Sequence, residues 1–242
     1  MHRDRGLPDG VDPALRQPHQ LLARVQHAVE IHDLVRFKRI VFTAGLGQKR
    51  LDPGVLGRDP VVLGRFFRLE RFDAAVLPVD ERWVDEDDAQ SNARLIRQQL
   101  LRECATAARF ISLKHPTSQP QAAQEACNAR LATLEQPLDV VVLGMGLDGH
   151  TASLFPDAPE LADALASTRC CHALSPASQP TARMSLTPAL LNAARRRVLH
   201  IEGEDKRRVL DAVLADPQAL RYPIAMALTA EAAAPLQIYW AA

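Results

Sequence analysis

Short apolar runs alternate with longer helical patterns along most of this chain, and this alternation restricts the possible folds more than any other feature. The run 139–144, DVVVLG, is typical of a strand that is covered on both faces. Strands of this kind that alternate with helices indicate an α/β fold. We therefore predict a doubly wound, mostly parallel sheet with helices on both faces, formed by residues 1–242 as one domain.

The predicted elements follow from apolar runs, helical spacing and capping residues. We expect strands at 40–44, 74–79, 109–113, 139–144, 197–202 and 236–241. We expect helices at 19–35, 89–107, 121–135 and 204–215, and another that begins at Thr187-Pro188. Helix 89–107 has apolar residues at three- and four-residue spacing, and Ser91 near its start is a candidate N-cap.

Charge and apolar content exclude several classes of partner. The chain has 29 basic and 29 acidic residues, so it lacks the basic excess that a nucleic-acid binder needs. No apolar stretch reaches the roughly 18 residues of a membrane span, and the N-terminus lacks the apolar run of a signal peptide. We expect a small-molecule ligand, with no nucleic acid and no membrane. The oligomeric state is left open between a monomer and a weak homodimer.

The cysteines indicate a reducing compartment. There are four, Cys104, Cys127, Cys170 and Cys171, with no C-x-x-C spacing, and two of them are adjacent and awkward to bridge. We expect a reduced, cytoplasmic protein without structural zinc.

Polar clusters follow two of the predicted strands, at the ends where open parallel sheets bind ligands. One is 80–83, Asp-Glu-Arg-Trp, and the other is 144–150, whose three glycines allow a tight backbone path and the close approach of a ligand. The second cluster ends with Asp148 and His150. A histidine beside a carboxylate can act as a general base near neutral pH.

Each cluster also has an ordinary interpretation. An Asp-Gly turn with a nearby histidine is common, and residues 80–82 alone are typical of a solvated strand end. Two clusters at equivalent strand ends favour function, because they are placed to converge on one cleft.

Three blocks of sequence resemble the 6-phosphogluconolactonases. They are LPVDERWVDEDDAQSNARLIRQQLL (77–101), VVVLGMGLDGHTASLFP (140–156) and ARMSLTPALLNAARRRVLHIEGEDKRRVL (182–210), and the resemblance covers about 73–240. It implies hydrolysis of 6-phospho-D-glucono-1,5-lactone to 6-phospho-D-gluconate in the oxidative pentose phosphate pathway, with no metal and no cofactor. It also implies the fold shared with glucosamine-6-phosphate deaminases and ribose-5-phosphate isomerases.

The residues after His150 favour the lactonase over the deaminase. The deaminases carry a similar Asp-Gly-His turn, but they follow it with Ile-Ala-Phe-Asn-Glu-Pro, whose glutamate supports the catalytic histidine. This chain has Thr-Ala-Ser-Leu-Phe-Pro at 151–156, so that glutamate is missing.

The resemblance and the chemistry of lactone opening together suggest roles for seven residues. His150 is the candidate base that deprotonates water, and Asp148 either orients it, contacts sugar hydroxyls or only forms the turn. The candidate substrate-binding residues are Asp80, Arg82, Gly146, Arg183 and Lys206. Of these, Arg183 and Lys206 match phosphate-contacting positions of the family, whereas Arg82 is placed for either the phosphate or the reacting end.

Neighbouring residues are expected to have structural or solvated roles. We expect Ser91 to act mainly as a cap, Asn92 to give structural support, and Arg195, Arg196 and Arg197 to be solvated.

The first 72 residues do not match the family pattern. Family members carry a Ser-Gly-Gly-Ser-Thr-Pro phosphate loop after the first strand, whereas residues 43–48 read Thr-Ala-Gly-Leu-Gly-Gln. One explanation is a divergent but folded phosphate site. The other, which we favour, is that this segment is not the N-terminal segment of the family, for instance through a shifted reading frame. The alternative function is therefore an impaired or non-catalytic sugar-phosphate-binding homologue. A sensor domain of a transcription regulator is disfavoured, because 1–70 contains no convincing helix-turn-helix.

Overall fold

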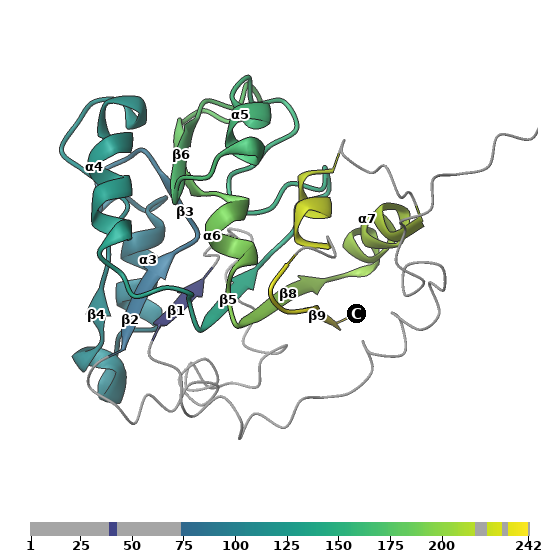
Figure 1. The fold of residues 1–242 in the computed structure, drawn as a ribbon, viewed down its shortest axis with the longest axis horizontal. Helices are drawn as coiled ribbons and strands as arrows, with labels where there is room; N and C mark the ends of the chain where they lie inside the picture. The colour runs from purple at the N-terminus through teal and green to yellow at the C-terminus, as the bar shows by residue number, and fades with distance from the viewer. Residues whose placement is uncertain (1–38, 43–73, 216–221, 229–231, 242) are drawn as a thin grey trace, which may run out of the picture.

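A six-stranded parallel sheet forms the centre of the molecule (Figure 1). The computed structural model describes residues 39–42, 74–215, 222–228 and 232–241. The strand order is β4-β2-β1-β5-β8-β9, and every neighbouring pair is parallel. The bounds are β1 Arg39–Phe42, β2 Ala75–Pro78, β4 Arg109–Phe110, β5 Val140–Leu143, β8 Arg196–Glu202 and β9 Leu236–Ala241. This confirms the predicted parallel sheet and the existence of all six predicted strands.

The direction in which the chain adds strands reverses between β1 and β5. Strands β2 and β4 extend the sheet on one side of β1, whereas β5, β8 and β9 extend it on the other. In doubly wound sheets, such a reversal marks the edge at which ligands bind, beyond the carboxyl ends of the strands. The cluster 144–150 directly follows β5, so the fold places it at this edge.

A smaller antiparallel sheet, absent from the sequence prediction, lies between helices α4 and α5 (Figure 1). Its order is β3-β7-β6, with β3 Asp80–Arg82, β7 Arg183–Leu186 and β6 Cys171–Leu174. Strand β3 begins two residues after the end of β2, so the cluster 80–83 is itself part of a sheet. The interpretation of 80–82 as a solvated strand end is wrong, because Asp80 and Glu81 are buried.

The predicted helices at 121–135, from Thr187-Pro188 and at 204–215 are confirmed apart from their ends, whereas the helices at Leu161–Ala166 and Pro223–Leu228 were not predicted. The bounds are α3 Asn92–Gln99, α4 Pro120–Ala132, α5 Leu161–Ala166, α6 Pro188–Asn192 and α7 Glu204–Ala215, with 3-10 helices η3 Glu103–Ala107 and η4 Pro223–Leu228. The predicted helix 89–107 is interrupted, because Leu100 ends α3 and Arg102 is extended, with φ −124° and ψ 162°. Ser91 is the N-cap of α3, as predicted.

Apolar side chains cover both faces of the central sheet. On one face, Val76 and Val140 pack with Ile96 and Leu100 of the α3 region. On the other, alternate residues of the same strands, such as Leu77 and Val141, belong to a larger cluster that includes residues of α4, α6 and α7. This double coverage explains why the 139–144 run is apolar rather than alternating.

Several sequence predictions fall outside the described residues. They include helix 19–35 and the segment 43–48 in the place of the phosphate loop. Strand β1, which precedes that segment, pairs with both β2 and β5. Within the part of the chain that the structure describes, no helix has the length and apolar character needed to cross a membrane.

Candidate active site

The turn that follows β5, residues 144–150, brings Asp148 and His150 together. His150 Nδ1 lies 2.6 Å from Asp148 Oδ1. Burial opposes ionisation of Asp148, but its hydrogen bonds with His150 outweigh this and lower its pKa. An ionised carboxylate at Nδ1 selects the neutral tautomer with its proton on Nδ1. The lone pair then resides on Nε2, which is the atom that can accept a proton from water.

Gly146 makes room for this pair. A Cβ atom at position 146 would lie 2.2 Å from His150 Nδ1 and 2.6 Å from Asp148 Oδ1. The turn is closed by hydrogen bonds from Gly146 N to His150 O (2.9 Å) and from Gly149 N to Gly146 O (3.1 Å). The structure thus gives Gly146 a steric reason to be glycine, whereas contact between Gly146 and a substrate stays a prediction.

The ring of Phe155 stacks against the ring of His150. The two ring centroids are 4.1 Å apart and the rings are inclined by 25°. Phe155 is itself fixed in a small apolar cluster with Leu154 and Ala158. The sequence analysis missed this contact, although Phe155 stands where the deaminase pattern has its glutamate.

The segment after His150 connects the turn to the small sheet. Thr151 Oγ1 donates to Gly144 O at 2.8 Å, which holds the segment against the end of β5. Ser153 Oγ donates to Asp80 Oδ2 at 2.7 Å, and Ser153 N donates to Ser185 Oγ at 3.2 Å. The two polar clusters predicted to converge are therefore joined directly, through a serine to which the sequence analysis assigned no role.

Arg82 and Arg183 face each other across the β3–β7 pair. Arg183 is only 5% exposed, and its Nη2 donates to Gln179 Oε1 at 2.8 Å. Its Nε and Nη1 atoms are buried and have no hydrogen-bond partner among the described residues. Burial and the nearby charge of Arg82 lower the pKa of Arg183 to about 10. Two cations side by side, with donors to spare, are what an anionic group requires.

Glu81, between Asp80 and Arg82 on β3, holds the start of α3. Its Oε1 accepts from Asn92 N at 2.7 Å and its Oε2 from Ala93 N at 2.7 Å. Burial raises the pKa of Glu81 to about 7, against the lowering effect of these backbone hydrogen bonds. The sequence analysis assigned Glu81 no role, because the two N–H donors by which it holds α3 lie eleven and twelve residues farther along the chain.

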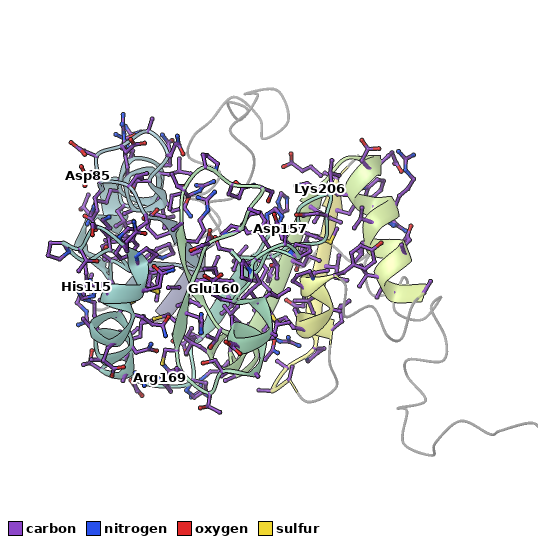
Figure 2. The ribbon with its side chains drawn as sticks, turned by 90° about the horizontal axis from the view of Figure 1, so that it is seen from above. Asp85, His115, Asp157, Glu160, Arg169 and Lys206 are labelled. Atoms are coloured by element: carbon purple, nitrogen blue, oxygen red, sulfur yellow. The ribbon has the colours of Figure 1, made fainter. Side chains whose placement is uncertain are left out.

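Lys206 lies in the first turn of α7, after the carboxyl end of β8 (Figure 2). Since β5 and β8 are neighbouring parallel strands, Lys206 and the 144–150 turn lie toward the same edge of the sheet. Lys206 makes no direct contact with His150 or Arg183, so this predicted site residue is not brought together with those two.

The expectation that Arg197 is solvated is wrong. In β8 the side chain of Arg197 points inward and is 1% exposed. It donates to Ala234 O, Ala227 O and Asn192 Oδ1, which ties the segments that carry these groups to β8. Arg195, in contrast, is an exposed partner of Asp139. The sequence analysis treated the run of three arginines as one surface patch. The two-residue period of β8 turns Arg197 inward and Arg196 to the opposite face, and Arg195 lies before the strand begins.

Among the described residues, no group of three or more His, Cys, Asp or Glu side chains is arranged to hold a metal ion.

Known proteins resemble this chain in both sequence and fold. Residues 65–240 match the family of glucosamine-6-phosphate isomerases and 6-phosphogluconolactonases. A 6-phosphogluconolactonase from Pseudomonas aeruginosa is 42% identical over 189 residues, which cover 76% of this chain and 78% of that protein. One from Pseudomonas putida is 38% identical over 246 residues, covering 98% of each.

A solved structure of the same named enzyme is similar to this chain in fold. The crystal structure of a 6-phosphogluconolactonase from Shewanella baltica superposes with a TM-score of 0.75 at 31% identity, and covers 95% of this chain and 94% of its own. With three ordered sequence blocks, the parallel sheet and the joined polar clusters, the chain belongs to the glucosamine-6-phosphate isomerase/6-phosphogluconolactonase family.

Proposed function

We propose that this chain is a 6-phosphogluconolactonase, which hydrolyses 6-phospho-D-glucono-1,5-lactone to 6-phospho-D-gluconate in the oxidative pentose phosphate pathway. The curated relatives at 42% and 38% identity carry that name. The observation that carries the proposal is the His150–Asp148 pair at the reversal of the strand order, with His150 backed by Phe155.

The proposed chemistry begins with water. His150 Nε2 takes a proton from a water molecule as its oxygen attacks C1 of the lactone. The carbonyl oxygen becomes an oxyanion, which needs a nearby donor or cation. The tetrahedral intermediate then collapses by breaking the bond between C1 and the ring oxygen, and the proton held by His150 is available to the departing oxygen. Asp148 holds Nδ1–H throughout, and so favours the protonated ring that forms midway.

The phosphate is proposed to lie against Arg183 and Arg82, with Lys206 as a further cation. The free Nε and Nη1 donors of buried Arg183 support this placement. Ser153 and Asn92 each donate to one carboxylate oxygen of Asp80 and so fix its position. Asp80 is proposed to bind sugar hydroxyls with the acceptor capacity that remains on these two oxygens. The alternative of a non-catalytic homologue is not favoured, because named lactonases match most of the chain.

We also propose a cytoplasmic location. The free cysteines Cys127, Cys170 and Cys171 are consistent with a reducing compartment.

The test is a coupled assay on the purified full chain. Freshly prepared 6-phosphogluconolactone is supplied, and the product is measured by its NADP-dependent oxidation against the spontaneous rate of hydrolysis. Turnover well above that rate, with no ammonia released from glucosamine 6-phosphate, is expected. A progress curve equal to the spontaneous one, or deaminase activity, would overturn the proposal. In the same assay His150→Ala is expected to lose turnover. His115→Ala is the matched control for that variant, because His115 contacts Arg130, which lies outside the site.

A further inference from the structure

The side chain of Asn92 is bonded to two residues of the proposed substrate site at once. Asn92 is fully buried at the start of α3. Its Oδ1 accepts a hydrogen bond from Arg82 Nη1. Its Nδ2 donates to Asp80 O at 2.7 Å and to Asp80 Oδ1 at 3.3 Å. One amide therefore holds the cation and the anion at the two ends of β3.

The polarity of the amide matches its surroundings. Oxygen faces the guanidinium of Arg82, and nitrogen faces the carboxylate of Asp80. Asparagine and glutamine offer an acceptor and a donor on one planar amide group, and glutamine is longer by a methylene. A leucine of similar volume would offer neither.

The backbone of Asn92 is fixed by other residues. Glu81 accepts its N–H at 2.7 Å and that of Ala93 at 2.7 Å, and Ser91 Oγ accepts from Arg94 N at 3.1 Å. These contacts do not involve the Asn92 side chain. Changing that side chain should therefore leave the start of α3 in place, so that an effect on binding can be separated from an effect on folding.

Arg82 needs this support because its neighbour across the sheet is also a cation. Arg82 and Arg183 are in direct register on β3 and β7. Two guanidinium groups at this separation repel each other, and Arg82 has a solvent-facing alternative because it is only partly buried. Besides Asn92, its guanidinium donates only a long bond, at 3.3 Å, to Gln90 O within the described residues. Without the amide acceptor, Arg82 is free to turn away from Arg183.

We propose that Asn92 is a positioning residue: it holds Arg82 beside Arg183, so that the two arginines form a ready-made site for the substrate phosphate. This inference rests on the proposed function, which places the phosphate at these arginines. An interaction that is made equally in the ground state and the transition state changes KM and leaves kcat. Loss of the Asn92 side chain should thus weaken phosphate-dependent binding and leave the chemical step largely intact.

The experiment compares Asn92→Leu with the matched control Ser91→Ala in the full chain. Measurements are kcat and KM for the lactone, the calorimetric Kd for 6-phosphogluconate, and Tm. Asn92→Leu is expected to raise KM and Kd by about tenfold or more, since a hydrogen bond to a charged group is lost, and to change kcat by less than about threefold. Ser91→Ala is expected to lower Tm by a few degrees through loss of the cap, with KM and Kd unchanged.

A double-mutant cycle with Arg82→Leu separates positioning from a general structural effect. If Asn92 acts through Arg82, Asn92→Leu adds little to the Kd of the Arg82→Leu protein. Two effects that add fully, or a wild-type KM and Kd in Asn92→Leu, would overturn the proposal. Asn92→Ala is the second variant should Asn92→Leu not fold, with the same expected changes. Wild-type protein that binds 6-phosphogluconate but does not turn over lactone would instead refute the proposed function, since the Kd measurement does not depend on turnover.

Discussion

Replacing Gly146 with alanine tests whether the close packing of the 144–150 turn sets the position of the catalytic base. The new Cβ would lie 2.2 Å from His150 Nδ1 and 2.3 Å from His150 Cε1. Non-bonded contacts of this kind settle at about 3.5 Å, so the ring must move by about 1 Å or more. Because Asp148 Oδ1 would be only 2.6 Å away, the Asp148–His150 pair cannot keep its present geometry.

A displacement of this size has a calculable effect on catalysis. Misplacing a reacting group by about 1 Å costs on the order of 100-fold in rate, which is about 2.7 kcal/mol at 1.36 kcal/mol per factor of ten. We therefore expect Gly146→Ala to lower kcat by about 100-fold. The His150 and Asp148 side chains are partly exposed, at 29% and 46%, so they can move outward and the fold should be retained.

The assay is lactone turnover with the product detected enzymatically, together with Tm and the Kd of 6-phosphogluconate. Gly203→Ala is the control: it also replaces a glycine, but its Cβ would meet nothing within 4 Å, and only the positive φ of Gly203, +83°, opposes the change. The control should lose about 1 kcal/mol of stability and keep its kcat. A Gly146→Ala enzyme with kcat within about twofold of the wild type would refute the argument.

Three further predictions concern Phe155, Glu81 and Arg197. Phe155→Leu keeps an apolar side chain but removes the stacked ring, so we expect kcat to fall several-fold with a loss of about 1 kcal/mol of stability; unchanged kcat in the lactonase assay would contradict this. Burial raises the pKa of Glu81 from 4.5 to about 7 in the folded state, so the folded protein binds the extra proton and its stability should fall as pH rises from about 4.5 to 7, by about 3 kcal/mol at most. Denaturant unfolding between pH 4.5 and 8 should show this slope in the wild type and not in Glu81→Gln, and parallel slopes would count against the assignment. Arg197→Met should cost about 3 kcal/mol or more by leaving buried carbonyl groups unpaired, whereas exposed Arg195→Met should change the unfolding free energy by less than about 1 kcal/mol; similar losses in both would be inconsistent with the structure.

The sequence was most informative where a structure depends on residues that are close together in the chain. The uninterrupted apolar run at 139–144 indicated a strand covered on both faces, and Val140 and Val141 indeed point into opposite apolar layers. Ser91 was recognisable as a cap because a helix start has a local signature. His150 and Asp148 were close enough in sequence for their pairing to be foreseen.

Contacts between distant segments were not predictable from local patterns. Ser153 and Asp80 are 73 positions apart, and their hydrogen bond exists only because β2 and β5 end at the same edge of the sheet. Arg197 resembled its exposed neighbours in sequence, and only the pleat of β8 turns it inward. The small sheet was missed because its strands are only three or four residues long, and because β3 pairs with β7, about a hundred residues farther along the chain.

The hypothesis that residues 1–72 are not the N-terminal segment of the family stays a prediction. Sequencing the coding region and the transcripts across codon 73 tests it directly. An intact frame through that junction would remove the idea of a shifted frame.

The measurement that tests the central claim most directly is the turnover of His150→Ala with fresh 6-phosphogluconolactone. His150 is proposed to activate water and not to hold the phosphate, so the variant should bind 6-phosphogluconate with a Kd close to that of the wild type. Its lactone hydrolysis should fall to the spontaneous rate, since loss of a general base costs about 100-fold to 10,000-fold. Turnover equal to that of the wild type would contradict the account.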